Sequence, residues 1–334
     1  MAFTPIFGTG WEHGIATLQN NLVYGGNTIV TSNKKTGSYA LQIRRGSIQF
    51  ALPTPVTEIY ASLWWNYNEV YSGGNSSYVG VILSDGKILK IQSSSTYFNY
   101  YIDSTLVGTG SHYITKNVWY NIKFRISIDD SSGVFHVKIN GVDDLVFTGD
   151  TKPSTGTAIT AVVFFCDGWN VYEQSDLTHY DDFIIGTGGW PDDLRFLALK
   201  PNGSTLTNEF IPSTSGASNY TMVDDIPMSS SDNVYTVISG AKDLYEIEDF
   251  ISSAGIINYN PRYVIQWALA KKDPANSQQF KFIQKYGDAE ITSSAIEIST
   301  EDLPYYFLRL INPSGTAWDD ASLDNLQIGQ EAII

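Results

Sequence analysis

The sequence is poor in cysteine, in charge and in long apolar runs. Cys166 is the only cysteine among 334 residues, which excludes an intrachain disulfide framework and a cysteine-based zinc site. Its apolar neighbours, residues 161–165, favour a small buried side chain over a reactive thiol. The four histidines show no metal-ligand spacing; they are His13, His112, His136 and His179. We therefore expect no cofactor held by cysteine or histidine.

The sequence also lacks apolar segments long enough for a membrane. No stretch approaches the roughly 18 consecutive apolar residues that suggest a membrane-spanning helix. Residues 1–5 lack the basic and apolar regions of a secretory signal. We expect no membrane partner, and either no export by this route or release by another route, such as lysis.

Charged residues make up only 16% of the chain, and the net charge is −15. Residues 1–187 carry 11 basic and 15 acidic side chains, whereas residues 188–334 carry 9 and 20. The negative charge is therefore concentrated in the C-terminal half. An acidic surface repels phosphate backbones, so nucleic acid is not an expected partner.

Aromatic residues are abundant at 13%, a composition typical of β-rich proteins. A chain of this length suits two cores of roughly 150 residues each. Residues 186–191 contain three glycines and a proline, and they form the best boundary in the sequence. We predict one domain over residues 1–187 and a second over residues 188–334.

Segment 119–151 shows the strand pattern most clearly. Apolar and polar residues alternate over 122–128 and again over 134–139, and Asn140-Gly141 then supplies residues that tolerate positive φ in a hairpin turn. Alternation predicts eleven strands in the first half, at 39–43, 48–52, 59–65, 78–83, 87–91, 98–102, 119–128, 134–139, 144–147, 159–166 and 180–185. This number of short strands indicates an antiparallel sandwich.

The second half shows the same kind of pattern. Strands are expected at 194–199, 220–223, 233–238, 256–271, 279–286, 290–298 and 305–310, and helices at 244–251 and 318–326. The predicted fold class is all-β, with two antiparallel β-sandwich domains. The second is the smaller and contains one or two short helices.

Asp-Asp pairs recur along the chain, at 129–130, 143–144, 181–182, 192–193, 224–225 and 319–320. Aspartate in turns bonds to its own backbone, so a turn role is the first expectation for each pair. Paired carboxylates also ligate calcium, which stays open as an alternative cofactor. No segment matches an EF-hand loop.

Catalytic patterns are missing. The Glu-x-Asp-x-x-Glu array of sandwich glucanases does not occur, nor does a nucleophile elbow, a phosphate loop or a dinucleotide fingerprint. We therefore expect no enzyme activity and assign no catalytic residue.

Three aromatic stretches combine rings with Asn or Asp, as sugar contacts require: 64–67, 97–101 and 167–172. Adjacent strand residues face opposite sides, so one of Trp64 and Trp65 belongs to the core and the other points outward. The candidate contacts are Trp64, Trp65, Tyr100 and Trp169. Packing against a partner subunit ranks before sugar contact as their role.

Residues 7–12 read Phe-Gly-Thr-Gly-Trp-Glu, and residues 180–186 read Tyr-Asp-Asp-Phe-Ile-Ile-Gly. Together with the 119–149 passage, they resemble the laminin-G/concanavalin A-like lectin and glucanase domains. The resemblance implies a concanavalin-like jelly roll over the first half. It is more specific for fold than for ligand.

Residues 188–334 resemble the C-terminal part of bacteriophage structural proteins that carry such a domain in front. The resemblance rests on residues 189–203, 219–225, 268–273 and 312–329. It implies a virion component with no catalytic residues to carry over. The chain departs from this group at Asp319, where the group usually has Thr after Trp318, a change from one good helix N-cap residue to another.

The leading hypothesis is a non-enzymatic structural protein of a tailed-phage virion, placed in capsid decoration, the neck or the tail. Its expected partners are other virion proteins and further copies of itself, with the acidic C-terminal half serving assembly. The alternative is a glycan-binding module that recognises host surface polysaccharide. A sandwich glycosidase is the weakest of the three hypotheses.

Overall fold

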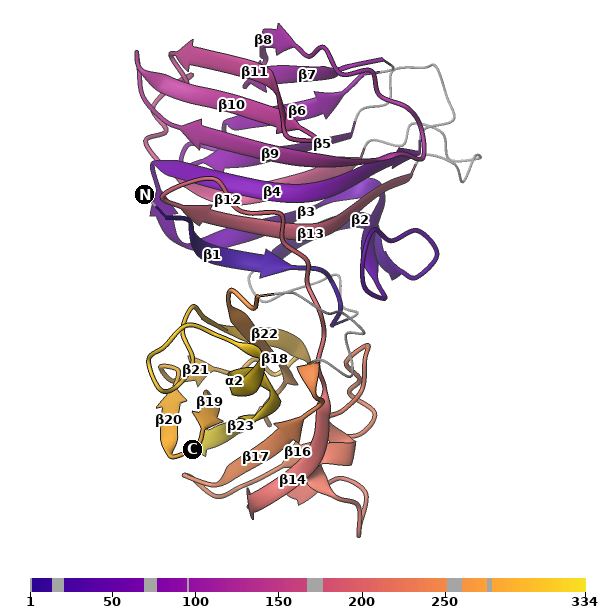
Figure 1. Ribbon diagram of the computed structural model, residues 1–334, viewed down its shortest axis with the longest axis vertical. Coiled ribbons are helices and arrows are strands. Elements are labelled where there is room, and N and C mark those ends of the chain that lie inside the picture. Colours follow the sequence, from indigo (N-terminus) through magenta and orange to yellow (C-terminus); the bar gives the residue numbers. More distant parts are fainter. Residues whose placement is uncertain are drawn as a thin grey trace. The chain divides into compact units, whose positions relative to one another are not determined.

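The computed structural model describes residues 2–13, 21–68, 77–94, 96–166, 177–250, 260–274 and 278–334. They form two compact units (Figure 1). The first comprises Met1–Glu12 and Ala16–Phe196, and the second comprises His13–Ile15 and Leu197–Ile334. The sequence placed the domain boundary after residue 187, whereas the first unit extends to Phe196.

The first unit is a two-layer antiparallel sandwich. One layer runs in the order β11, β10, β9, β4, β13, β1, and the other runs β2, β3, β12, β5, β6, β7, β8 (Figure 1). Their bounds are β1 Thr4–Thr9, β2 Asn21–Val30, β3 Ala40–Val56, β4 Glu58–Asn68, β5 Ser77–Leu83, β6 Ile88–Ser93, β7 Phe98–Ile102, β8 Thr105–Thr109, β9 Trp119–Ser127, β10 Gly133–Ile139, β11 Val142–Gly149, β12 Ile159–Cys166 and β13 Leu177–Thr187.

Strand β3 forms the corner between the two layers. Its first part pairs with β13 through Thr178–Tyr180, and its later part pairs with β12. The eleven strands expected in this half are present, with 39–43 and 48–52 merged into β3. The sequence patterns missed β1, β2 and β8.

The core between the layers is aromatic. Trp65 of β4 lies 5.1 Å from Phe98 and 5.9 Å from Tyr180 between ring centroids, and Phe164 lies 4.7 Å from Tyr180. Each of these side chains is at most 2% exposed. Burying a ring of this size contributes about 1.5–3 kcal/mol, so the alternating pattern fixes which face of each strand points inward.

The hairpin predicted at Asn140-Gly141 is confirmed. Both residues have positive φ, at 51° and 84°, and β10 pairs with β11 across them. The β9, β10 and β11 meander therefore forms as the sequence indicates.

Residues 188–196 continue along the first unit. Trp190 lies 5.6 Å from the Tyr60 ring, the carbonyl of Pro191 accepts a hydrogen bond from Lys123 Nζ at 2.9 Å, and Phe196 N donates to Asp182. These contacts explain why this unit extends past the glycine-rich segment.

The second unit is a smaller β-structure with two layers. One sheet has the order β14, β17, β23, β19, β20 with β21 beside β19, and β18 pairs with β22 in a separate sheet. Phe282 of β19 stacks on Phe307 of β22 at 6.1 Å, so the two sheets face each other. The bounds are β14 Pro201–Asn208, β15 Ile211–Pro212, β16 Val234–Tyr235, β17 Lys242–Ile247, β18 Val264–Ala270, β19 Gln279–Tyr286, β20 Ala289–Thr292, β21 Ile296–Glu297, β22 Leu303–Arg309 and β23 Leu326–Ile333.

Several predictions for the second unit are wrong. Segment 194–199 is not a strand, and segment 220–223 lies largely in the 3₁₀ helix Asn219–Met222. The segment expected to form a helix from residue 244 begins instead as strand β17. Its pairing with β14 and β23 overrides the helix propensity of this segment. The late helix is confirmed as α2, Asp320–Asp324. Asp319 caps it by accepting a hydrogen bond from Ser322 N at 2.8 Å.

All recorded strand pairings are antiparallel, and the predicted all-β class with two sandwich-type domains is confirmed. Among the described residues, no helix is long and apolar enough to cross a membrane.

Candidate functional site

The structure separates the four predicted contact residues. Trp65 is 1% exposed and Tyr100 is 0% exposed, because both point inward from their strands. Neither ring can stack on a ligand in this conformation. Trp64 points outward and is partly exposed, as the alternation of β4 requires. Trp169 lies outside the described residues.

Trp64 belongs to a surface that we call the β4 face, the outer side of β9, β4 and β13. Two rows of cross-strand neighbours form it. Trp119, Asn66 and His179 make one row, and Asn121, Trp64 and Asp181 make the next. The other sides of these strands face the core, so alternate residues point outward; the next rows, with Ser62 and Lys123 and then Tyr60 and Arg125, continue the same face.

Two indoles occupy diagonal positions on this face. Trp119 of β9 and Trp64 of β4 belong to adjacent rows, and both are partly exposed. Diagonal neighbours on an antiparallel pair lie about 7–8 Å apart at Cα, within reach of each other's large rings. We call this pair of indoles the platform.

A polar cluster adjoins the platform. Asn33 Nδ2 lies 3.3 Å from Asn66 Oδ1, to which it donates, and 3.1 Å from His179 Nδ1. The His179 ring is also 6.5 Å from that of Trp119. Burial lowers the pKa of His179 to about 4, so its imidazole is neutral at physiological pH and Nδ1 can accept the Asn33 hydrogen bond.

Lys35 lies over the platform. Its Nζ is 4.1 Å from the centroid of the Trp64 ring, a cation–π contact, and the side chain is exposed. Among the described residues, no carboxylate lies within ion-pair distance of this ammonium. Lys35 and Asn33 both come from the segment between β2 and β3, which we call the anchored loop, residues 33–39.

Buried carboxylates hold the anchored loop. Asp181 Oδ2 accepts hydrogen bonds from Lys35 N at 2.8 Å and Thr36 N at 3.1 Å. Asp182 accepts from Thr36 Oγ1 at 2.7 Å. Glu12 accepts from Ser38 N at 2.9 Å. These bonds fix the loop backbone and so set the positions of its side chains.

Gly37 is required within this arrangement. Its φ is +56°, and a Cβ at this position would overlap the Glu12 carboxylate. A residue with a side chain would meet both backbone strain and a steric clash. The loop shape of residues 34–38 therefore depends on glycine at position 37 and is held by hydrogen bonds to the three acids.

The three acids share a low-dielectric site, and this raises their pKa values. Desolvation raises the pKa of Glu12 to about 7, against the opposing effect of its backbone hydrogen bonds. Desolvation also raises the pKa of Asp181 and of Asp182, with the Asp182 charge adding to the effect on Asp181. Proximity of like charges in a buried site disfavours full ionisation.

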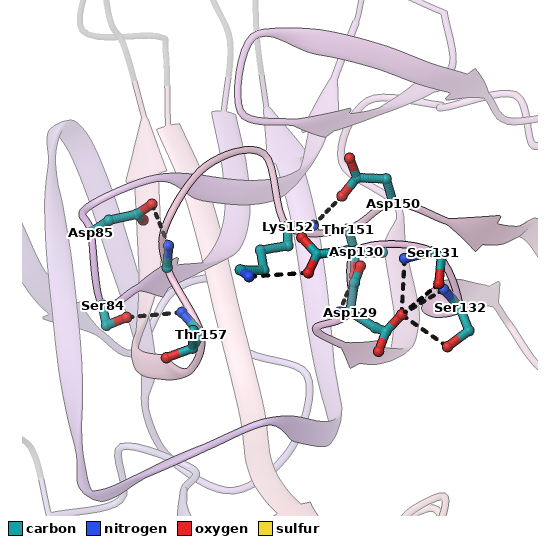
Figure 2. A network of polar contacts seen from close by, with 11 residues as sticks. Ser84, Asp85, Asp129, Asp130, Ser131, Ser132, Asp150, Thr151, Lys152 and Thr157 are labelled. Carbon is teal, nitrogen blue, oxygen red and sulfur yellow. Dashed lines mark hydrogen bonds and ion pairs between the residues drawn. The ribbon is translucent and has the colours of Figure 1, made fainter.

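The turn role predicted for the Asp pairs holds only in part. Figure 2 shows Asp129 accepting hydrogen bonds from Ser131 and Ser132, a turn role as predicted. Asp181 and Asp182 are instead buried within β13, and the prediction is wrong for them. Asp144 in β11 likewise accepts from Tyr100 and from Ser111 N, so it joins strands rather than closing a turn.

The acidic side chains do not form a metal site among the described residues. Among the described residues, no group of three or more His, Cys, Asp or Glu side chains is placed to hold a metal ion. The oxygen atoms of Glu12, Asp181 and Asp182 already accept hydrogen bonds from the anchored loop. Calcium binding therefore stays a prediction, and the geometry of the described residues does not support it.

The other end of the β4 face is covered. Trp190 contacts the His136 ring at 5.1 Å, and Lys138 Nζ lies 5.0 Å from the Trp190 centroid. Lys123 Nζ pairs with Asp193 at 2.7 Å. The accessible part of the face thus comprises the two partly exposed indoles, the partly exposed amide of Asn33 and the ammonium of Lys35, whereas Asn66 and Asn121 are buried.

Sequence reasoning missed Trp119, Asn33 and Lys35. The sequence could have indicated that Trp119 points outward, because it lies on the same face of the strand as Asn121 and Lys123. Tyr120 lies on the face that carries the apolar residues. Asn33 and Lys35 could not, because only the tertiary contacts of the anchored loop bring them to β4.

Neither a scan against protein-family models nor a search of curated proteins finds a match. Solved structures similar to this chain include "Cellulose induced protein, Cip1", at TM-score 0.38 and 14% identity over 55% of this chain and 100% of that chain. A protein of unknown function with a galectin-like fold from Bacillus subtilis shows TM-score 0.38 and 11% identity over 55% and 98%. Domain 4 of AbnA, an arabinanase from Geobacillus stearothermophilus, shows TM-score 0.38 and 17% identity over 56% and 93%. Structural similarity with such low TM-scores and sequence identities does not identify a ligand for this chain.

Proposed function

We propose that the first unit is a glycan-binding module and that the β4 face is its binding surface. The observation that carries the proposal is the diagonal pair Trp64 and Trp119, two partly exposed indoles on adjacent strands. Sugar rings present apolar C–H faces that pack on indoles, as aromatic rings pack on apolar surfaces in general.

Hydrogen-bonding groups beside the platform support the same function. Asn33 is partly exposed and lies next to the Trp119 row, where its Nδ2 donates to Asn66 Oδ1. Asn121, the direct cross-strand neighbour of Trp64, is buried. Amide side chains both donate and accept, as recognition of a hydroxyl requires. A binding site with a few placed polar groups around apolar rings has the usual composition of small-ligand sites.

The proposal is tested with a glycan array probed by the full chain and by Trp119→Ala. Wild type is expected to bind a subset of glycans, and loss of a central aromatic contact is expected to weaken binding by about tenfold or more. The matched control is Tyr101→Ala, which removes a partly exposed ring of β7, on the outer side of the other layer of the sandwich. No binding above background, or equal loss in both variants, would contradict the proposal.

A second candidate function is assembly through the second unit, as in a virion. Among the described residues, nine of the fifteen large exposed hydrophobic side chains belong to this smaller unit; they are Leu197, Leu206, Ile211, Tyr235, Val237, Ile238, Leu310, Ile311 and Ile334. Scattered exposed apolar residues are common, but this density favours a protein partner. The resemblance of this half to phage structural proteins motivates the same role.

This second function is tested by mass spectrometry of purified phage particles from a host that carries the gene. A structural protein is expected to co-purify with particles and to resist washing in high salt. Absence of the chain from the particles would contradict the virion role without affecting the glycan proposal.

A further inference from the structure

The ammonium of Lys35 occupies the place where a sugar would stack. It lies 4.1 Å from the Trp64 centroid, over the ring face. A ring face covered by a cation cannot at the same time accept the C–H face of a sugar. Any ligand that stacks on Trp64 from this side must therefore displace Lys35.

Displacement has different consequences for neutral and acidic ligands. A neutral sugar removes the ammonium from the ring and offers no charge in return. A sugar carboxylate can pair with the displaced ammonium through a charge-assisted hydrogen bond, which is stronger than a neutral one. Lys35 therefore weakens the binding of neutral sugars and strengthens the binding of acidic sugars.

The other charged groups of the β4 face do not alter this asymmetry. Lys123 pairs with Asp193, and Arg125 pairs with Glu58 at 2.7 Å. Those cations are already neutralised within the protein. Lys35 differs from them because the structure records no ion pair for its ammonium among the described residues.

The nearby acids are also engaged. Asp181, the cross-strand neighbour of Trp64, is 0% exposed and points its Oδ2 at the backbone amides of the anchored loop. Asp182 is 2% exposed and bonds Thr36 Oγ1. These carboxylates hold the backbone that carries Lys35, while the ammonium itself extends over the platform.

We infer that the β4 face selects acidic glycans, those with a uronate or other sugar carboxylate, and that Lys35 is the residue that sets this selectivity. The inference rests on the proposed function, because it names the class of glycan that this surface takes. Trp119 supplies stacking for either class, and Lys35 discriminates between them.

The test compares polyuronates with their carboxyl-reduced counterparts, which keep the backbone and lose only the charge. Affinities are measured by calorimetry for wild type, Lys35→Met and Lys90→Met. Wild type is expected to prefer the acidic form by about tenfold, the scale of one charge-assisted contact. Lys35→Met is expected to lose this preference through weaker binding of the acidic form and unchanged or tighter binding of the reduced form.

Lys90→Met is the matched control, because Lys90 also lies over aromatic rings, on the opposite outer face, and its substitution should leave the preference intact. Equal affinity of wild type for both forms, with binding still lost in Trp119→Ala, would overturn the selectivity and leave the proposed function standing. Binding of neither form, together with a blank array, would overturn both.

Discussion

The two outer faces of the sandwich use the same contact in different ways. On the β4 face, the exposed Lys35 comes from a loop and covers one indole. On the opposite face, Lys90 of β6 lies between the rings of Tyr78 and Tyr101, at 5.1 and 4.9 Å from their centroids. Phe165 stacks on Tyr78 at 4.7 Å. We call this second surface the β6 face.

The difference lies in what holds each cation. Lys90 is part of a strand, and desolvation lowers its pKa, as expected for an ammonium packed between rings. Lys35 belongs to a loop that is held by hydrogen bonds to three buried acids. We expect its side chain to leave the ring without disturbing the fold. We therefore expect the lysine–aromatic contact of Lys35, and not that of Lys90, to take part in binding.

The largest expected effect comes from the anchored loop. Gly37→Ala introduces a side chain at positive φ and against Glu12, and it is expected to destabilise the first unit by about 3 kcal/mol, from backbone strain and lost hydrogen bonds to a charged group. The measurement is urea unfolding. Gly86→Ala, in the turn between β5 and β6, is the control.

Gly86 also has positive φ, at +83°, but nothing lies within 4 Å of a Cβ there. Its substitution should cost only the backbone strain, about 1 kcal/mol. Equal destabilisation by the two changes would show that the contact with Glu12 does not constrain the loop.

The next effect is a pH dependence that belongs to the anchored loop, through Glu12. The pKa of Glu12 in the folded state is about 7, above its ordinary value. Such a shift adds stability that is complete below the ordinary carboxyl pKa and is lost as the pH rises through about 7. The melting temperature of the first unit should therefore fall by several degrees over this rise.

Glu12→Gln should reduce this slope, since the amide does not ionise, while the raised pKa values of Asp181 and Asp182 keep part of it. Glu58→Gln removes an acid that pairs with Arg125 on the same strand layer and serves as the control. Thermal unfolding at a series of pH values measures both. A wild-type slope in Glu12→Gln would contradict the assignment.

A smaller effect is expected at Asn33. Asn33→Ala leaves the buried Asn66 Oδ1 and His179 Nδ1 without their donor, which should cost about 1–2 kcal/mol and weaken glycan binding. Asn99→Ala on β7 removes only an exposed hydrogen bond with Thr109. Denaturation that shows no difference between the two variants would argue against a structured polar cluster.

The smallest effect distinguishes the two lysines by stability alone. Lys90→Met should lower the stability of the first unit by about 0.5 kcal/mol, the value of a cation–π contact, while Lys35→Met should change it less. Chemical denaturation of both variants provides the measurement. A larger loss in Lys35→Met would mean that Lys35 is a structural residue, and it would reverse the comparison of the two faces.

Much of the first unit could be predicted, because alternation is a local property of the sequence. It required one of Trp64 and Trp65 to be buried, and the structure buries Trp65. The same alternation places Phe98, Tyr100 and Ile102 on one face of β7, so the sequence predicts that Tyr100 points inward. Choosing Tyr100 as a surface contact overlooked that pattern.

The anchored loop and much of the second unit could not be predicted in this way. Asp181 and Asp182 read as turn residues because their partners lie about 145 positions away in the sequence. Strands of two residues, such as β15 and β16, are too short to show a period. In both regions the structure is set by contacts between residues distant in sequence, and a local pattern does not reveal such contacts.

The central claim is that ligands reach the β4 face and stack there. Indole N–H signals of the eight tryptophans, assigned with single Trp→Phe variants, can be followed by NMR during titration with a glycan that the array selects. Our account predicts that the signals of Trp64 and Trp119 move while those of the buried Trp11 and Trp65 stay in place. Movement of neither Trp64 nor Trp119 at saturating glycan would contradict it.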